Sequence, residues 1–212
     1  MSSSDASTHI SPFLLGLTGD IASGKSTVAK LLQKRGAAVI DADHLVRELY
    51  SDPNFAQQIQ ALFPETDVLT ANGGIDRALL GGVVFGDEGK LRVLEALVHP
   101  QVEALRAQKI QQLSTHNVVV LEAVKLVESG QANICHALWW IRSRPDTQFA
   151  RLVSERGLSE IEAIARLRNQ PPPEIKARLM QELCIPITMI HNDGTLEDLE
   201  TNVQAAWEAL SF

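Results

Sequence analysis

The apolar positions at the start of the chain change their period at a glycine-rich turn. Residues 13–18 form a short apolar run, which is typical of a buried strand in a parallel sheet. Residues 26–35 then show the 3.6-residue period of an amphipathic helix, and residues 37–41 predict a second strand. A strand, a glycine-rich loop, a helix and a strand in this order begin a parallel α/β fold.

The middle of the chain carries mostly helical periodicity. Asp76 is placed to cap a helical run that reaches Val84, and Asp87 is placed to cap a run that reaches Val98. The same period continues beyond Val98. We therefore expect residues 43–115 to form a helical subdomain inserted between strands of the sheet.

The second half of the chain returns to short apolar runs. Residues 117–121 and 137–141 predict buried strands of the same sheet. Residues 185–190 predict a last strand, and Pro186 places it at a sheet edge or at a strand start, because proline cannot donate to a strand ladder. Residues 196–210 predict a closing amphipathic helix.

A helical hairpin is predicted before the last strand. Residues 146–155 and 159–168 have amphipathic patterns that join near Gly157, and three prolines at 171–173 follow them as a breaker. We expect this hairpin to move as a lid.

Composition and charge narrow the choice of partners. A chain of 212 residues with 45% hydrophobic content can bury a core, and its length fits one globular unit. The net charge of -7 speaks against broad nucleic-acid binding and favours a phosphorylated small molecule. Cys135 and Cys184 have neither close spacing nor a nearby histidine pattern, which indicates ordinary reduced thiols.

The start of the chain is polar and rich in serine. Residues 1–11 lack the apolar stretch of a signal peptide and are expected to fray. No apolar run approaches the length of a membrane span. We therefore expect a soluble cytoplasmic protein with no membrane partner; the sequence does not indicate an oligomeric state.

The glycine-rich turn matches the phosphate-binding loop pattern G-x-x-x-x-G-K-[ST]. Its defined positions are Gly19, Gly24, Lys25 and Ser26, between an apolar strand and a helix. Glycine is needed where backbone N–H groups must wrap phosphate oxygens, and the positive end of the helix points at the same anion. The residues predicted to bind a nucleoside triphosphate are Gly19, Asp20, Ile21, Ala22, Ser23, Gly24, Lys25, Ser26 and Thr27.

The residues of this loop have different predicted roles. Lys25 reaches the β and γ phosphates as a mobile charge, the Ser26 hydroxyl holds Mg²⁺, and Thr27 lies beside the α phosphate. Asp20 is unexpected, since phosphates repel a nearby carboxylate unless it points outward.

Acidic residues follow two of the predicted strands. Asp41 and Asp43 come at the carboxyl edge of the sheet, where a carboxylate can accept the proton of an attacking hydroxyl. Asp43 has an alternative role as the N-cap of a helix over residues 45–50. Glu122 ends a strand like an acid that orients Mg²⁺ through water, unless it is a solvated strand end. Lys125 either contacts a substrate phosphate or is solvated.

Together these pieces resemble the dephospho-coenzyme A kinase family over roughly residues 14–203. The likeness is carried by residues 16–19, 23–29, 39–43, 74–77, 84–85, 99–100, 126–130, 148, 151–152, 156, 170 and 192–195. The resemblance implies transfer of the γ-phosphoryl group of ATP to the ribose 3′-hydroxyl of dephospho-coenzyme A, the last step in making coenzyme A.

The resemblance also implies roles for single residues. Asp43 resembles the general base, Arg156 a lid arginine that meets the ATP phosphates, and Asn192 with its neighbours part of the adenine pocket. Arg77 and His99 resemble substrate-side residues; with Asp41 and Lys125, which come from their places near strand ends, they are the substrate-side candidates. The open alternatives are a salt bridge within its helix for Arg77, a helix boundary for His99 and a solvated helix end for Arg156.

The implied fold is an α/β P-loop nucleotide-kinase-like three-layer fold with a mostly parallel five-stranded sheet, a helical substrate-binding insertion and a helical lid. We expect a single P-loop kinase domain over residues 1–212. Its expected parts are a core at about 12–42, 116–145 and 184–212, a coenzyme-binding insertion at about 43–115 and a lid at about 146–180.

The chain departs from the family pattern at three places. Asp20 and Ala22 stand where glycines are usual, Val124-Lys125 replaces a Pro-Leu step, and residues 186–187 replace an Ala-Asp pair. Two other functions stay open: another P-loop kinase of a small alcohol or nucleotide, and a nucleotide-binding relative without catalysis.

Overall fold

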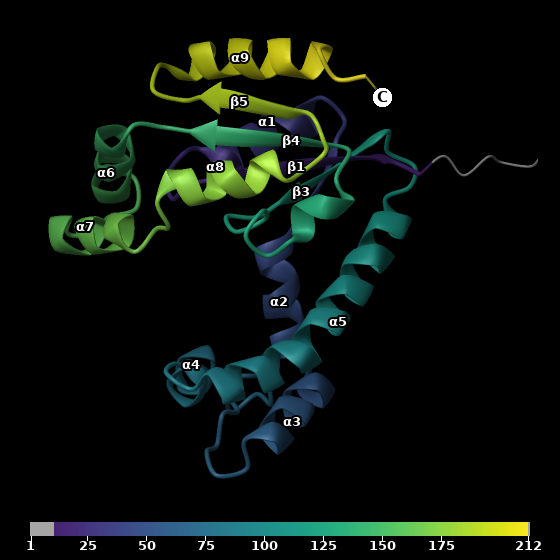
Figure 1. Cartoon of the computed structure of the whole chain (residues 1–212), viewed down its shortest axis with the longest axis vertical. Coiled ribbons are helices and arrows are strands. Elements are labelled where there is room, and N and C mark those ends of the chain that lie inside the picture. Colours follow the sequence, from purple (N-terminus) through teal and green to yellow (C-terminus); the bar gives the residue numbers. More distant parts are fainter. Residues whose placement is uncertain (1–10, 212) are drawn as a thin grey trace, which may run out of the picture. The chain divides into compact units, whose positions relative to one another are not determined.

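The computed structural model describes residues 11–211. The chain forms two compact units: one comprises the segments up to Asp41 and from Gln112 onward, and the other comprises Ala42–Gln111. Figure 1 shows both, coloured along the sequence. The predicted fraying concerns residues that, apart from Ser11, lie outside the described part of the chain. Within residues 11–211, no helix has the length and apolar character of a membrane span.

The first unit is built on a parallel sheet. Within the described residues, its strands are β1 (Phe13–Gly19), β2 (Ala38–Asp41), β3 (Val118–Glu122), β4 (Ala137–Arg142) and β5 (Ile187–His191). They pair in the order β2-β3-β1-β4-β5, and every pair is parallel. The predicted five-stranded sheet and the edge position of its last strand are confirmed. Because β1 is central, the loop after it leaves the sheet in the middle of the carboxyl edge.

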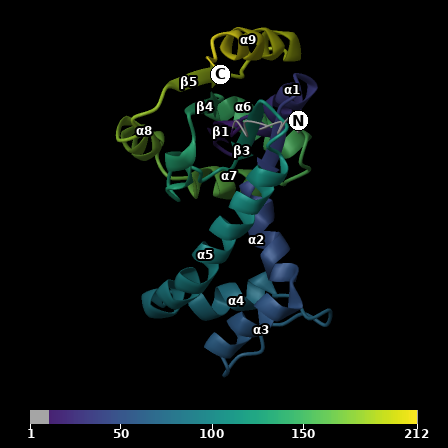
Figure 2. The same cartoon turned by 90° about the vertical axis from the view of Figure 1, so that its right-hand side faces the viewer.

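Helices cover both faces of this sheet, which confirms the three-layer α/β fold. On one face, α1 (Lys25–Lys34) and α9 (Leu196–Glu208) pack against the strands. The fully buried residues between them include Leu15, Leu17, Val28, Leu32, Val120, Trp139, Ile141 and Val203. On the opposite face lies α8 (Pro173–Gln181), as Figures 1 and 2 show.

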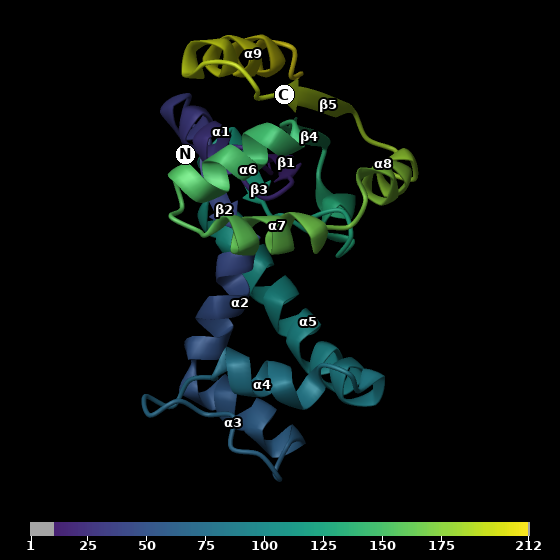
Figure 3. The same ribbon diagram turned by 90° about the vertical axis from the view of Figure 1, so that its left-hand side faces the viewer.

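The predicted helical hairpin is present as α6 (Pro145–Ser154) and α7 (Glu160–Arg168). The two helices lie side by side in Figure 3. Ser159 caps α7 by accepting from the N–H of Glu162, whose carboxylate accepts from the N–H of Ser159 in return. This reciprocal capping box satisfies two helix-end donors at once.

The second unit is helical. It contains α2 (Ala42–Ser51), α3 (Pro53–Leu62), α4 (Arg77–Val84) and most of α5 (Glu88–Gln112). Asp76 Oδ1 accepts hydrogen bonds from the N–H groups at the start of α4, at 2.9 and 3.0 Å, and Asp87 Oδ1 does the same for α5, at 3.0 Å each. Both predicted caps are therefore confirmed.

Three helices differ from the sequence prediction. The sequence pattern did not predict α3 or α8 as separate helices, and α8 begins at the third proline of the predicted breaker. Both begin with proline. Proline suits the first position of a helix, because an N–H group there would have no acceptor within the helix. Helix α2 begins directly after β2, so Asp43 lies inside its first turn. The alternative that Asp43 caps a later helix is wrong.

Candidate active site

A tight loop joins the central strand β1 to helix α1. The N–H of Ser23 donates to the carbonyl oxygen of Asp20 at 3.2 Å, and the N–H of Thr27 donates to that of Gly24 at 3.0 Å. Gly24 has a left-handed φ of 94°, and a Cβ at this position would collide with Nδ2 of Asn192. Only glycine meets both conditions. Backbone shape and space therefore require the second glycine of the motif.

Ala22, one of the departures from the family pattern, is also left-handed, with φ 55°. This conformation costs a non-glycine residue about 1–2 kcal/mol. Its buried side chain packs against Leu152 of α6 and Ala163 of α7. Burial of one methyl group contributes about 0.8 kcal/mol, which offsets part of that strain. The loop is thus held by apolar contact with the α6–α7 hairpin.

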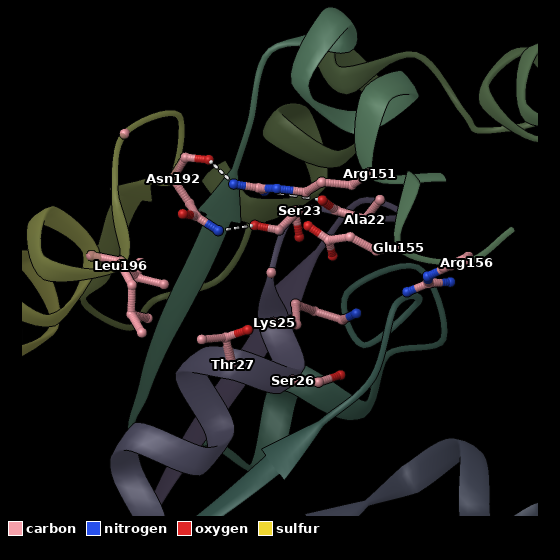
Figure 4. Close-up of a pocket in the computed structure, with 13 residues that line it drawn as sticks. Ala22, Ser23, Lys25, Ser26, Thr27, Arg151, Glu155, Arg156, Asn192 and Leu196 are labelled. Atoms are coloured by element: carbon pink, nitrogen blue, oxygen red, sulfur yellow. Dashed lines mark hydrogen bonds between the residues drawn. The ribbon is translucent and has the colours of Figure 1, made fainter. Parts of the chain in front are cut away.

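A pocket of about 390 Å³ opens at the N-terminus of α1. Its lining residues, shown in Figure 4, are Ala22, Ser23, Gly24, Lys25, Ser26, Thr27, Arg151, Glu155, Arg156, Asn192, Gly194, Leu196 and Leu199. The N–H groups and the dipole at the start of a helix attract anions. The structure therefore brings most of the predicted phosphate loop together with the predicted nucleotide contacts Arg156 and Asn192.

Arg151 connects the walls of this pocket. Its Nη1 donates to the carbonyl oxygen of Ala22 at 3.2 Å, and its Nη2 donates to that of Asn192 at 2.9 Å. Asn192 in turn donates through Nδ2 to the carbonyl oxygen of Ser23 at 2.8 Å (Figure 4). A planar guanidinium holds two acceptors in a fixed geometry. Arg151 and Asn192 therefore fix the phosphate loop against the segment after β5.

Lys25 and Glu122 lie close together at the carboxyl edge of the sheet. Lys25 Nζ is 4.0 Å from Glu122 Oε1, and the two side chains are only 11% and 15% exposed. Asp41 is the partner of Glu122 in the register of β2 and β3. Glu122 is therefore not a solvated strand end, and the edge gathers the predicted lysine with two predicted acids.

Oxygen donors for a metal are present near the phosphate loop. Ser26 is exposed in the first turn of α1, and Glu122 offers a carboxylate at the end of β3. In the described part of the chain, no group of three or more His, Cys, Asp or Glu side chains is placed to hold a metal. Mg²⁺ keeps several waters and takes nucleotide oxygens beside one or two protein ligands. The donor set suits a metal that arrives with the nucleotide.

Asp20 and Ile21 belong to the loop but do not line the pocket. Asp20 Oδ1 lies 3.4 Å from Nζ of Lys176 in α8. The N–H of Ile21 donates to Oε1 of Gln170, just beyond α7, at 2.7 Å. The Asp20 carboxylate thus contacts a cation and does not line the pocket. This position agrees with the expectation that Asp20 must point away from the phosphates.

The remaining predicted residues lie outside this pocket. Lys125 is exposed in the loop after β3. Asp43, Arg77 and His99 belong to the second unit, where α5 continues past His99 without a helix boundary. Arg77 is exposed at the start of α4. Burial raises the pKa of Tyr50 above its ordinary value, and the charge of Arg77 opposes this shift.

Several residues that line the pocket have no site role predicted from the sequence. They are Arg151, Glu155, Leu196 and Leu199, whereas Gly194 is one of the neighbours of Asn192 predicted to form the adenine pocket. A signal for Arg151 existed, because it follows Gln148 by one helical turn and stands next to the apolar Leu152. Polar side chains on a helix face that is buried need hydrogen-bond partners, as Gln148 finds in the carbonyl oxygen of Ser143 at 2.9 Å.

Gly24→Ala is expected to weaken MgATP binding at least about tenfold, or ~1.4 kcal/mol. The added Cβ would displace Asn192 and with it the wall of the pocket. Gly36→Ala is the matched control, since Gly36 has a similar φ of 90° but no atom within 4 Å of the added Cβ. Calorimetric titration measures both. Equal affinity of the two variants for MgATP would contradict this account.

Sequence comparison shows the family to which this chain belongs. The sequence profile of the dephospho-CoA kinase family matches residues 13–198. A dephospho-CoA kinase from Symbiobacterium thermophilum is 40% identical over 200 residues, which cover 92% of this chain and 80% of that protein. The dephospho-CoA kinase from Geobacter sulfurreducens is 38% identical over 197 residues, which cover 92% and 96% of the two chains.

Solved structures share the fold. A crystal structure of a protein from Thermus thermophilus is 34% identical, has a TM-score of 0.77, and covers 96% of this chain and 100% of its own. A dephospho-CoA kinase from Campylobacter jejuni, 22% identical, gives a TM-score of 0.60 over 94% of this chain and 97% of its own, which supports the fold alone. With a phosphate loop, a nucleotide-sized pocket and these relatives, the chain belongs to the dephospho-CoA kinase family, a family of ATP-dependent kinases.

Proposed function

We propose that this chain transfers the γ-phosphoryl group of ATP to the ribose 3′-hydroxyl of dephospho-CoA. The observation that carries the proposal is the carboxyl edge of the sheet, where the phosphate loop lies beside the acids that end β2 and β3. Family membership supplies the acceptor, since the relatives that align over 92% of the chain are named for it. Because ATP is its co-substrate, we place the enzyme in the cytoplasm.

The first step of the proposal is binding of the triphosphate by charge. Backbone N–H groups at the start of α1 surround the phosphates, and Lys25 carries a mobile charge to the β and γ positions. Arg156, exposed at the pocket, brings a planar cation to the same oxygens as charge develops during transfer. Asn192 and its neighbours form the wall for the adenine.

Mg²⁺ is the proposed metal. When bound with ATP, it neutralises charge on the β and γ phosphates. The Ser26 hydroxyl would hold it directly, and Glu122 would orient one of its waters. Glu122 already lies 4.0 Å from the Lys25 ammonium, so the same carboxylate positions the lysine.

Asp43 is the proposed general base. The 3′-oxygen forms a bond to the γ phosphorus, the bond from that phosphorus to the β–γ bridging oxygen breaks, and ADP leaves. The hydroxyl proton passes to the carboxylate. Asp43 suits this task because it lies in the first turn of α2 without serving as its N-cap. The proposed substrate-side residues are Asp41, Arg77, His99 and Lys125.

With MgATP, the purified chain is expected to release ADP much faster with dephospho-CoA than with adenosine or a simple sugar. Lys25→Ala should lower this turnover ~10²- to 10³-fold, because it removes one preorganised charge at the transition state. Lys30→Ala, an exposed lysine farther along α1, is the matched control and should leave turnover unchanged.

The same assay separates the alternatives. Transfer to a nucleoside or sugar, with none to dephospho-CoA, would assign the chain to another class of P-loop kinase. Binding of ATP without transfer to any acceptor would make it a catalytically silent relative.

Asp43→Asn should leave the affinity for MgATP close to that of the wild type while turnover with dephospho-CoA collapses, since the amide cannot accept the proton. Asp41→Asn is the matched comparison two residues away, and should mainly raise KM for dephospho-CoA. Single-turnover kinetics with saturating ATP distinguish the two effects. Normal turnover of the Asp43 variant would contradict the assignment of Asp43 as the base, and collapse in the Asp41 variant instead would transfer that role to Asp41.

A further inference from the structure

A buried lysine contacts the phosphate loop and has no role in the proposed chemistry. Lys176 of α8 is only 4% exposed. Its Nζ lies 3.4 Å from Asp20 Oδ1, 3.4 Å from Glu128 Oε1 and 3.1 Å from the carbonyl oxygen of Val124. A buried ammonium is costly unless charged and polar partners surround it. These partners come from two places: the phosphate loop and the loop after β3.

We propose that Lys176 is a positioning residue for nucleotide binding, which holds the Asp20 carboxylate outside the pocket and so keeps negative charge away from the phosphates. This inference rests on the proposed function only in taking ATP as the ligand. Asp20 follows the last residue of β1 directly, while the pocket lining begins two residues later, at Ala22. A carboxylate this close to a triphosphate repels it unless a cation fixes it elsewhere.

The surroundings of Lys176 make it a fixed support. The carbonyl oxygen of Val124 that accepts from Lys176 also accepts from the Thr18 hydroxyl of β1, at 3.0 Å. Gln170, six residues before Lys176, accepts the N–H of Ile21 at 2.7 Å. Three prolines at 171–173 lie between these two anchors and restrict the backbone that joins them. One short segment therefore holds two successive loop residues, Asp20 by its side chain and Ile21 by its backbone.

Charge balance makes the lysine necessary for this arrangement. One ammonium faces two carboxylates, which are each 17% exposed. Glu128 Oε2 is buried and has no hydrogen-bond partner within the described residues, so Glu128 depends on its contact with Lys176. Without the lysine, two partly buried carboxylates would repel each other, and Asp20 is the one that belongs to the phosphate loop. Asp20 stands where glycine is usual in the family, and Lys176 supplies the positive charge that balances its carboxylate.

The test is MgATP binding by calorimetry in the absence of dephospho-CoA, so that a wrong acceptor assignment leaves it unaffected. Lys176→Met should weaken binding about tenfold, and Lys176→Met combined with Asp20→Asn should restore most of the loss, because the phosphate loop then carries no carboxylate that needs a counter-charge. Arg178→Met removes the same charge from an exposed position of α8 and should bind normally. The melting temperature of each variant is measured as well. It shows whether a loss of MgATP affinity is only a consequence of lower stability.

Two results would overturn the proposal. One is wild-type affinity in Lys176→Met; the other is an equal loss in the single and double variants, which would make Lys176 a general stabilising residue. If Lys176→Met does not fold, the same measurements are made on the double variant Glu128→Gln/Lys176→Met. In that variant, Asp20 is the charged residue that remains of the three residues Asp20, Glu128 and Lys176. Adding Asp20→Asn there should improve binding about tenfold, and no improvement would equally overturn the proposal.

Discussion

The phosphate-binding loop has to keep a strained backbone with its N–H groups directed at an anion, and the rest of the first unit depends on this constraint. Ala22 and Gly24 both have positive φ, at 55° and 94°. Holding such residues in one conformation costs conformational entropy, and the left-handed backbone of Ala22 adds strain. The surrounding chain offsets it: Arg151 and Asn192 bind carbonyl oxygens of the loop, while Gln170 and Lys176 hold its first residues. Because these contacts all come from the protein itself, we expect the loop to be shaped before a nucleotide arrives.

The strand order divides the neighbours of the loop into two groups. Because β1 is central, the loop has β3 and β2 on one side and β4 and β5 on the other. The first side carries the acids Asp41 and Glu122. In the proposed mechanism, Asp41 lies on the substrate side and Glu122 orients a water of the metal. On the second side, Ser143 follows β4 and Asn192 follows β5. The Ser143 hydroxyl accepts a hydrogen bond from Arg151, and the Asn192 side chain donates one to the carbonyl oxygen of Ser23. In the proposed mechanism the first side serves the reaction, while the second side supplies hydrogen bonds that hold the pocket together.

Local features of this protein were predictable from sequence, and long-range pairings were not. The strands, the glycine-lysine-serine motif and the caps Asp76 and Asp87 each depend on residues a few positions apart. Lys176 and Asp20 are 156 positions apart, and Arg151 and Ala22 are 129 apart. The sequence did not explain Asp20, because its counter-charge belongs to α8, a helix that the pattern did not predict after the three prolines. The roles of Asp43, Arg77 and His99 stay predictions, since each depends on where the acceptor binds.

Hydrogen exchange at the Ile21 amide, followed by NMR in the nucleotide-free protein, tests most directly whether the loop is shaped in advance. This N–H donates to Oε1 of Gln170, and neither residue lines the pocket. The account predicts slow exchange without nucleotide, little changed by MgATP, and much faster exchange in Gln170→Ala. Exchange at the rate of an unfolded chain until MgATP is added would contradict it, because the nucleotide itself would then order the loop.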